Sequence, residues 1–258
     1  MRSERLSIII PTHNRPEFIR RTLFYYHSAK CNFKIVISDS SDVSKKKENI
    51  KIVKAYKKKL CITYFHTEQS FHYKIKEALN RVDSDYVTLC SDKDFIVIKN
   101  LVKCVNFLRK NNDYCLVIGK EITFLNIDEY SLLSCSMIYI RINENYDCEF
   151  EQASERLSNY LSNYFPIIYS VFRTNSLINA VNKTINISSG SNRFSELILS
   201  TNLIINGKAK LLNLFLIVRQ YHSSTGSASK KWHHEIYDQS FKTKYAAFVK
   251  VLIKTSMP

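Results

Sequence analysis

Short apolar runs alternate with segments of helical period through the first half of the chain. The runs have the length of buried strands, and Phe18, Ile19, Leu23 and Tyr26 recur between the first two at helical spacing. The pattern predicts strands at 6–10, 34–38, 62–65, 86–90 and 115–118, with helices from Pro16, from about Ser44, at about 72–82 and at about 99–110. This alternation is typical of an α/β fold with a Rossmann-like, mainly parallel central sheet and flanking helices.

The second half is less regular and predicts a smaller, mixed part. The expected elements are strands within 119–150, a helix at about 149–164 stopped by Pro166, a strand at 167–172, a helix at 192–205 capped by Gly207, a strand at 211–218 and a mobile loop at 223–229. The helix from about Ser44 is basic, and we expect Ile50, Val53 and Leu60 on its buried side.

Polar and acidic residues gather where the predicted strands end. Thr12 and Asn14 follow the first strand, Asp39 the second, and the run Asp92-Lys93-Asp94 the fourth. Ligands of parallel sheets bind at the carboxyl ends of the strands, so these residues predict a single site. Two carboxylates two residues apart on an exposed edge, pointing out together, suit a hard divalent cation that also takes phosphate oxygens.

Composition excludes several classes of protein. The chain has 258 residues, which is enough for one large α/β domain or two small ones. Its only glycines are Gly119, Gly190, Gly207 and Gly226, so neither a G-x-G-x-x-G fingerprint nor a P-loop is present. No apolar stretch approaches a membrane span, and no signal peptide is expected. The seven cysteines form no C-x-x-C pair, which favours a reduced, cytoplasmic protein.

The formal net charge is +15, with lysines clustered at 45–47, 57–59 and 230–231. The charge predicts attraction to an anionic surface, either the cytoplasmic leaflet with a lipid-linked acceptor or an acidic glycan. A genome rich in A and T would also produce a chain this rich in Lys, Ile and Asn. No nucleic-acid motif is present, so we expect no nucleic-acid partner.

Three segments carry a resemblance to a known family. "SIIIPTHNRPEFI" at the start, "KIVISDSS" from Lys34 and "YVTLCSDKDF" from Tyr86 resemble the nucleotide-diphospho-sugar glycosyltransferases of family 2, which have the GT-A fold. The resemblance covers about residues 5–222. It is nearest to a bacterial surface-polysaccharide branch whose motif is a run of three Asp, the middle one of which is Lys93 here.

The resemblance implies a fold, a domain organisation and an activity. It implies a GT-A domain at 1–222, with a nucleotide-binding half to about 118 and an acceptor-side half from about 119, followed by a loop and helical tail at 223–258. The implied enzyme is cytoplasmic or peripheral on the inner face of the membrane. It transfers a sugar with inversion from a nucleotide-sugar, a UDP-sugar being favoured, to a glycan or lipid-linked acceptor. The rivals are a non-catalytic sugar-nucleotide or glycan-binding GT-A module and a nucleotidyltransferase on a similar sheet.

The resemblance also implies roles for individual residues. The expected nucleotide-sugar contacts are Pro11, Thr12, Asn14, Arg15, Asp39, Asp92 and Lys93, and the expected ligands of Mg²⁺ or Mn²⁺ are Asp94, Asp92 and His222. A cation at Lys93 beside that ion would partly replace its charge. Alternatively, Thr12 or Asn14 caps the helix at Pro16, and Asp39 caps a turn.

Glu196 is the expected general base for the acceptor hydroxyl. Its expected place just inside a helix N-terminus favours the ionised carboxylate, because the helix dipole stabilises a negative charge there. The alternative role is a capping glutamate in the first turn of that helix.

Overall fold

The protein is built around one mixed β-sheet that is covered by helices on both faces. The computed structural model describes residues 6–126, 135–141, 148–187, 192–221 and 239–256. The strands within these ranges are β1 (Leu6–Thr12), β2 (Lys34–Asp39), β3 (Ile62–His66), β4 (Tyr86–Leu89), β5 (Phe95–Ile96), β6 (Tyr114–Asn126), β7 (Cys135–Arg141), β8 (Val171–Arg173) and β9 (Lys208–Tyr221). The helices are α1 (Pro16–Ser28), α2 (Val43–Tyr56), α3 (Phe71–Leu79), α4 (Ile98–Lys110), α5 (Ala153–Ser162), α6 (Thr174–Ile187), α7 (Asn192–Asn206) and α9 (Gln239–Ser256).

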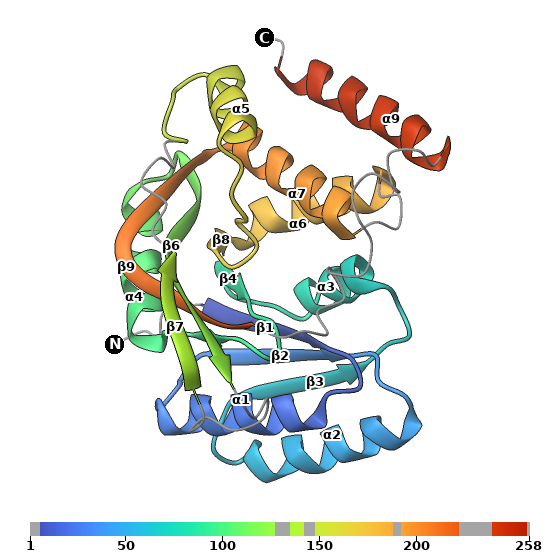
Figure 1. Cartoon of the computed structure of the whole chain (residues 1–258), viewed down its shortest axis with the longest axis vertical. Coiled ribbons are helices and arrows are strands. Elements are labelled where there is room, and N and C mark those ends of the chain that lie inside the picture. Colours follow the sequence, from blue (N-terminus) through green and yellow to red (C-terminus); the bar gives the residue numbers. More distant parts are fainter. Residues whose placement is uncertain (1–5, 127–134, 142–147, 188–191, 222–238, 257–258) are drawn as a thin grey trace.

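The described strands form one sheet in the order β3-β2-β1-β4-β8-β6-β9-β5, with β7 paired to β6 (Figure 1). The strands β3, β2, β1 and β4 are parallel, as the alternation of strands and helices predicts. From β8 onward the pairing is mixed, because β8 runs antiparallel to β4 and β6 while β9 runs parallel to β6. The expected division near residue 118 falls inside β6.

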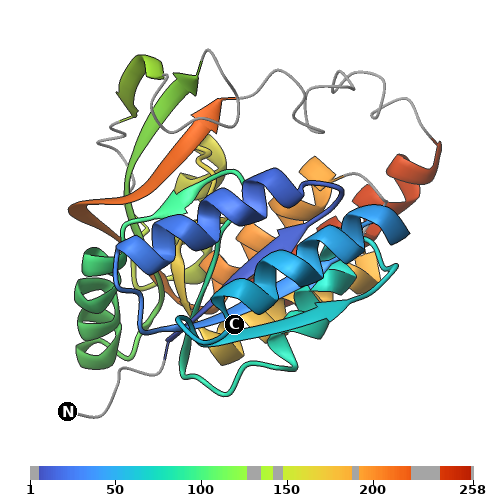
Figure 2. The ribbon, with the colours of Figure 1, turned by 90° about the horizontal axis from the view of Figure 1, so that it is seen from below.

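The first strand, β1, is buried on both faces of the sheet, with helices packed on each face. Ile8 and Ile10 pack into the cluster that holds the buried residues of α1, α2 and α4. Ile9 points the other way, into the cluster formed with α3, α6 and α7. Both faces are apolar, so β1 reads as a continuous apolar run rather than an alternating one. Figure 2 shows α1 and α2 side by side across one face of the sheet.

The parallel register aligns the strand ends that the sequence singled out. Thr12 lies opposite Asp39 in the pairing of β1 with β2. The N–H of Cys90, just past β4, donates to the carbonyl of Ile9 in β1 at 2.9 Å. Thr12, Asp39 and the Asp92–Asp94 turn therefore reach the same edge of the sheet, as predicted.

Several expected details are wrong. In α2 Val53 is buried as expected, together with Asn49 and Ile52, but Ile50 is only half-buried and the buried Leu60 lies beyond the helix end. The strand expected at 167–172 is confined to 171–173, because the residues before it form turns. The sequence reasoning missed α6 altogether. The loop expected at 223–229 lies outside the described residues.

The long strands β6 and β9 approach each other closely at Gly119. A Cβ added there would lie 2.3 Å from the Cβ of Leu216 and 2.9 Å from the carbonyl oxygen of Leu214. Only a residue without a side chain fits this approach. Among the described helices, none is long and apolar enough to cross a bilayer.

We expect Gly119→Ala to lower the free energy of unfolding by about 1–3 kcal/mol, because the added methyl group overpacks the interface with β9. Urea denaturation followed by circular dichroism measures the change. The control is Ser158→Ala on the exposed side of α5, which should stay within about 0.5 kcal/mol of the wild type. A Gly119→Ala protein as stable as that control would contradict the close approach.

Candidate active site

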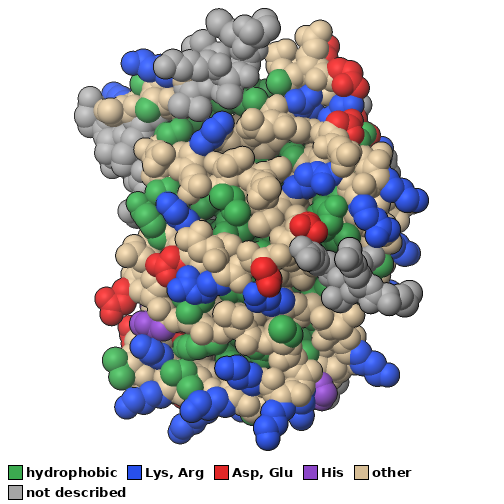
Figure 3. All heavy atoms as spheres, turned by 180° about the vertical axis from the view of Figure 1, so that it is seen from behind, with side chains coloured by type: hydrophobic (Ala, Val, Ile, Leu, Met, Phe, Trp, Pro, Cys, Tyr) green, Lys and Arg blue, Asp and Glu red, His purple; other side chains and the backbone are tan. Residues whose placement is uncertain are grey.

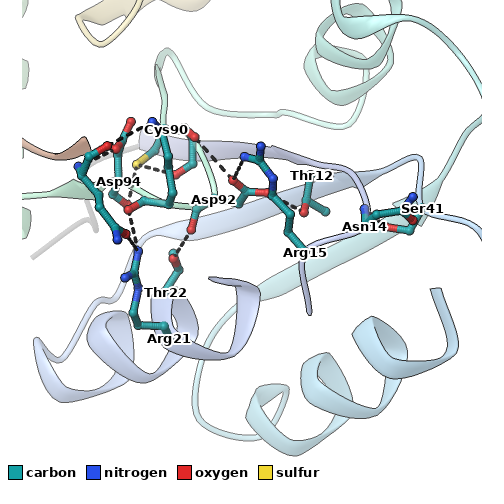
Figure 4. Close-up of polar contacts among 12 residues, drawn as sticks. Thr12, Asn14, Arg15, Arg21, Thr22, Ser41, Cys90, Asp92 and Asp94 are labelled. Atoms are coloured by element: carbon teal, nitrogen blue, oxygen red, sulfur yellow. Dashed lines mark hydrogen bonds and ion pairs between the residues drawn. The ribbon is translucent and has the colours of Figure 1, made fainter. Parts of the chain in front are cut away.

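The predicted site residues lie in a row along one edge of the sheet. Figure 4 shows Asn14 and Ser41 at one end, Asp92 in the middle and Asp94 at the other end. Because each follows a strand of the same parallel set, the row extends across β2, β1 and β4. Its two ends therefore face different neighbours and have different chemistry.

Asp92 occupies the middle of the row and is 3% exposed. Its carboxylate accepts a hydrogen bond from the hydroxyl of Thr12 at 2.7 Å and pairs with the guanidinium of Arg15 at 3.4 Å. Burial raises the pKa of Asp92, and Arg15 and Thr12 oppose that shift. The arrangement brings together three residues that the sequence predicted for one nucleotide-sugar site.

Asp94 is fully buried, contrary to the expected exposed edge. One carboxylate oxygen accepts from the hydroxyl of Tyr169 at 2.6 Å and the other from the backbone N–H of Gln220 at 3.0 Å. The guanidinium of Arg219 lies 3.9 Å away. Burial raises the pKa of Asp94, with Lys93 as the strongest opposing influence. Asp92 bonds toward β1 and Asp94 toward β9, so the two do not point out of the edge together.

The turn between the two carboxylates is held by its backbone. Thr22 of α1 donates to the carbonyl of Asp92 at 2.6 Å, and Arg21 of α1 donates to the carbonyl of Lys93 at 2.8 Å. Arg21 also donates to the side-chain oxygen of Gln220 at 2.6 Å. Turn carbonyls have no partner within a sheet, and buried ones need a donor from elsewhere. Neighbouring positions of α1 thus link the turn to the end of β9.

Asp39 sits at the end of β2 in a ring of donors. The backbone and hydroxyl of Ser41 donate to one carboxylate oxygen, and Asn49 at 3.0 Å and Tyr64 at 2.6 Å donate to the other. Burial alone would raise the pKa of Asp39, but these hydrogen bonds together lower it. Asp39 is therefore an ionised, buried acceptor, which also fits the turn-capping alternative.

Asn14 joins the loops that follow β1 and β2. Its φ of 55° is left-handed, a conformation that Asn adopts more readily than most residues. Its side chain exchanges two hydrogen bonds of 2.8 Å with Asp42, and its N–H donates to the hydroxyl of Ser41 at 2.8 Å. This is a clamp between loops rather than a helix cap. Pro11 is half-buried within β1.

A lysine on α3 reaches the same edge from the other face. The ammonium of Lys74 donates to the carbonyl of Thr12 and to the hydroxyl of Ser40, both at 2.9 Å. Its side chain is buried, and burial lowers its pKa against the attraction of Asp92 and Asp39. Lys74 therefore holds the ends of β1 and β2 by hydrogen bonds and adds positive charge near Asp92 and Asp39.

Glu196 lies on α7, which begins at Asn192. It is beyond the first turn, so the expected capping role and helix-terminus effect are wrong. Burial raises the pKa of Glu196, while Arg219 and a hydrogen bond with Tyr164 oppose the shift. The guanidinium of Arg219 lies 5.0 Å from the ring centre of Tyr169 and 3.1 Å from Glu121. Arg219 therefore acts electrostatically both on the expected base and on Asp94 at the end of the row.

The described residues do not fit the expected Mg²⁺ or Mn²⁺ as they stand. Among them no three His, Cys, Asp or Glu side chains are grouped to hold a metal ion. Both oxygens of Asp94 already accept hydrogen bonds, and Asp92 is engaged by Thr12 and Arg15. His222 lies outside the described residues, so its role as a ligand stays a prediction.

Sequence reasoning missed the residues that hold these groups. Tyr169, Gln220 and Lys74 stand in no motif, and local spacing offers no signal that any of them contacts a strand end on another part of the chain. Arg219 had a weak signal, because it precedes the expected ligand His222 at the end of a predicted strand. These contacts arise from the order of strands, which the sequence pattern does not encode.

We expect Asp94→Ala to lower the free energy of unfolding by about 1–3 kcal/mol, because it leaves Tyr169 and the N–H of Gln220 buried without their acceptor. Urea denaturation gives the value. Glu155→Ala, on an exposed position of α5, is the matched control and should change little. Equal stability of the Asp94 variant and the wild type would restore the exposed-edge expectation.

Comparisons with known proteins identify the family and the fold of the chain. The sequence profile of "Glycosyl transferase family 2" matches residues 7–157. A search of curated proteins finds no significant match. A structure of S. aureus TarS 1-349 in complex with UDP-GlcNAc is similar with a TM-score of 0.65 and 14% identity, covering 98% of this chain and 68% of that one.

Two further solved structures share the fold. The mannosyltransferase PcManGT from Pyrobaculum calidifontis, in complex with GDP-Man and Mn²⁺, has a TM-score of 0.53 and 11% identity, covering 98% of this chain and 65% of that one. The 4-diphosphocytidyl-2C-methyl-D-erythritol synthase from Anaerococcus prevotii has a TM-score of 0.51 and 13% identity, covering 95% of this chain and 98% of that one. At these identities the likeness shows the fold alone. The profile match spans more than half of the sequence, and the chain therefore belongs to glycosyl transferase family 2, as a nucleotide-sugar-dependent glycosyltransferase.

Proposed function

We propose that the enzyme transfers a sugar from a nucleoside-diphosphate sugar to a hydroxyl of a glycan or lipid-linked acceptor in bacterial surface-polysaccharide synthesis, with inversion. The observation that carries the proposal is the row of Asp39, Thr12, Asp92 and Asp94, at whose Asp94 end Arg219 acts electrostatically on the half-buried Glu196. The nucleoside would lie at the Asp39 end and the sugar at the Asp94 end. The acceptor would then approach from the side of α7.

The reaction that this geometry supports is a single displacement. The acceptor hydroxyl oxygen attacks the anomeric carbon as the bond from that carbon to the diphosphate oxygen breaks. The hydroxyl proton passes to the carboxylate of Glu196, and the nucleoside diphosphate leaves. Burial raises the pKa of Glu196, which makes the ionised carboxylate a stronger base than an exposed one.

UDP-sugars are the first donors to test, since TarS, the relative with the TM-score of 0.65, was solved with UDP-GlcNAc. GDP-sugars come next, since PcManGT was solved with GDP-Man. A non-catalytic sugar-nucleotide module would bind a donor without turnover. A nucleotidyltransferase would instead form the nucleotide-sugar from a nucleoside triphosphate, and the family profile disfavours it.

We expect Glu196→Gln to bind a UDP- or GDP-sugar as the wild type does, while transfer falls by about 10²–10⁴-fold, because the proton acceptor is lost. Calorimetry gives donor affinity, and a product assay gives the transfer rate. The wild-type kcat/KM should rise with pH as Glu196 deprotonates, with a midpoint above the usual 4.5 because the pKa of Glu196 is raised. The Gln variant should lack that rise.

The control for this test is Glu155→Gln on the exposed side of α5, which should keep both binding and rate. Near-normal transfer by Glu196→Gln would remove Glu196 from the mechanism. Donor binding by the wild type without any transfer to glycan or lipid-linked acceptors would favour the non-catalytic module.

The basic surface supports a place at the inner face of the membrane. α2 and the turn after it carry the lysines Lys45, Lys46, Lys47, Lys51, Lys54, Lys57, Lys58 and Lys59. Figure 3 shows Lys and Arg side chains gathered at the lower end of the molecule, where α1 and α2 lie in Figure 1. Each lysine near an anionic leaflet contributes about 1 kcal/mol of attraction.

We expect the wild type to sediment with anionic vesicles at low salt and to be released at high salt, because screening acts within about 8 Å at physiological ionic strength. The double variant Lys51→Glu/Lys54→Glu should bind these vesicles more weakly. The matched control is Lys99→Glu/Lys103→Glu, which reverses two exposed charges on α4 instead. Equal sedimentation with neutral and anionic vesicles would leave genome composition as the explanation of the charge.

A further inference from the structure

Positively charged side chains of the protein lie where the diphosphate of a donor would bind in this site. A diphosphate that joins a nucleoside at Asp39 to a sugar near Asp94 must pass the middle of the row. Arg15 stands there beside Asp92 with its side chain 34% exposed, and Arg219 stands at the Asp94 end with its side chain 30% exposed. Lys93, in the turn between Asp92 and Asp94, follows the carboxylate that pairs with Arg15 and precedes the one beside Arg219.

Both carboxylate oxygens of Asp94 accept hydrogen bonds from within the protein. Its oxygens hold Tyr169 and the N–H of Gln220 on the end of β9. The carboxylate is 0% exposed, so a divalent ion could reach it only if a neighbouring side chain moved aside. Such an ion needs several oxygen ligands, and no cluster of that kind exists among the described residues.

The ammonium of Lys93 lies where it can supply the positive charge that such an ion would supply. Its ammonium donates to the backbone carbonyl of Gln220 at 3.0 Å, which anchors it at the turn. An ammonium has three donors, and that carbonyl occupies one of them. Its backbone carbonyl is held in turn by Arg21, so the position of the residue is fixed at both ends. A charge already oriented in a buried site needs little reorganisation when an anion arrives.

We propose that Lys93, flanked by Arg15 and Arg219, binds the donor diphosphate in place of a divalent cation, so that donor binding does not require a metal. The proposal rests on the proposed function, since it concerns the same donor. Each phosphate of a diphosphate-sugar carries a negative charge, and the three side chains supply the compensating positive charge. The middle residue of the acidic motif then sets the metal requirement of the site.

The test measures donor binding directly, by calorimetry with UDP and GDP and their sugars, in EDTA and in Mn²⁺. The wild type should bind its donor in EDTA with an affinity within about threefold of that in Mn²⁺. Lys93→Met should bind at least tenfold more weakly in EDTA, because a charge-assisted contact is lost. Lys93→Arg should keep metal-free binding, since it keeps the charge. Lys93→Asp should bind only when Mn²⁺ is present.

Lys51→Met is the matched control, because it removes an exposed lysine of α2 away from the turn. Its donor affinity should equal that of the wild type in EDTA. Thermal midpoints show whether each variant is folded, and the wild-type titration remains decisive if Lys93→Met is not.

The outcomes separate this proposal from the proposed function. Donor binding by the wild type in Mn²⁺ but not in EDTA overturns the proposal and leaves the glycosyltransferase assignment of the site intact. Equal binding by Lys93→Met and wild type in EDTA overturns the role of Lys93. No binding of any tested nucleoside diphosphate or its sugar, with or without Mn²⁺, overturns the proposed donor site itself.

Discussion

The buried carboxylate of Asp94 is the interaction on which the rest of the site depends. Its donors are the hydroxyl of Tyr169, which precedes β8, and the N–H of Gln220 near the end of β9. A carboxylate removed from water is tolerated only when it is paired and hydrogen-bonded. Three distant segments of the chain must therefore meet at Asp94 in one arrangement. The Asp92–Asp94 turn, the approach to β8 and the end of β9 are consequently a single unit.

This unit determines where the chemistry is placed. Arg219, on β9, lies beside Asp94 and acts electrostatically on Glu196 of α7. A buried ion pair contributes little net stability, since desolvation offsets the attraction between the charges. The contacts of Asp94 instead fix the positions of Tyr169 and the end of β9 relative to the turn. The same burial that hides Asp94 from a metal ion concentrates positive charge at Lys93, Arg15 and Arg219 beside the expected diphosphate path.

The residues expected at the strand ends lie there, but most of their contacts were not predicted. Asp39 was expected at the end of the second strand and lies there, but Asn49 on α2 and Tyr64 on β3 complete its environment. Glu196 was expected on the helix where it lies, but at the wrong turn of it. In α2, the spacing favoured Ile50, whereas the packing against the sheet buries Ile52. Each difference comes from a neighbour that is remote in sequence.

The sequence by itself determined the parallel half of the sheet, the helices between its strands and the edge at which the polar residues meet. Local patterns suffice for these, because the period of burial follows from the geometry of a strand or a helix. Only the tertiary structure decided the antiparallel insertion of β8, the pairing of β9 with β6 and the burial of Asp94. Those depend on which distant segments pack together. No local period encodes that choice, since the same carboxylate is exposed or buried according to what covers it.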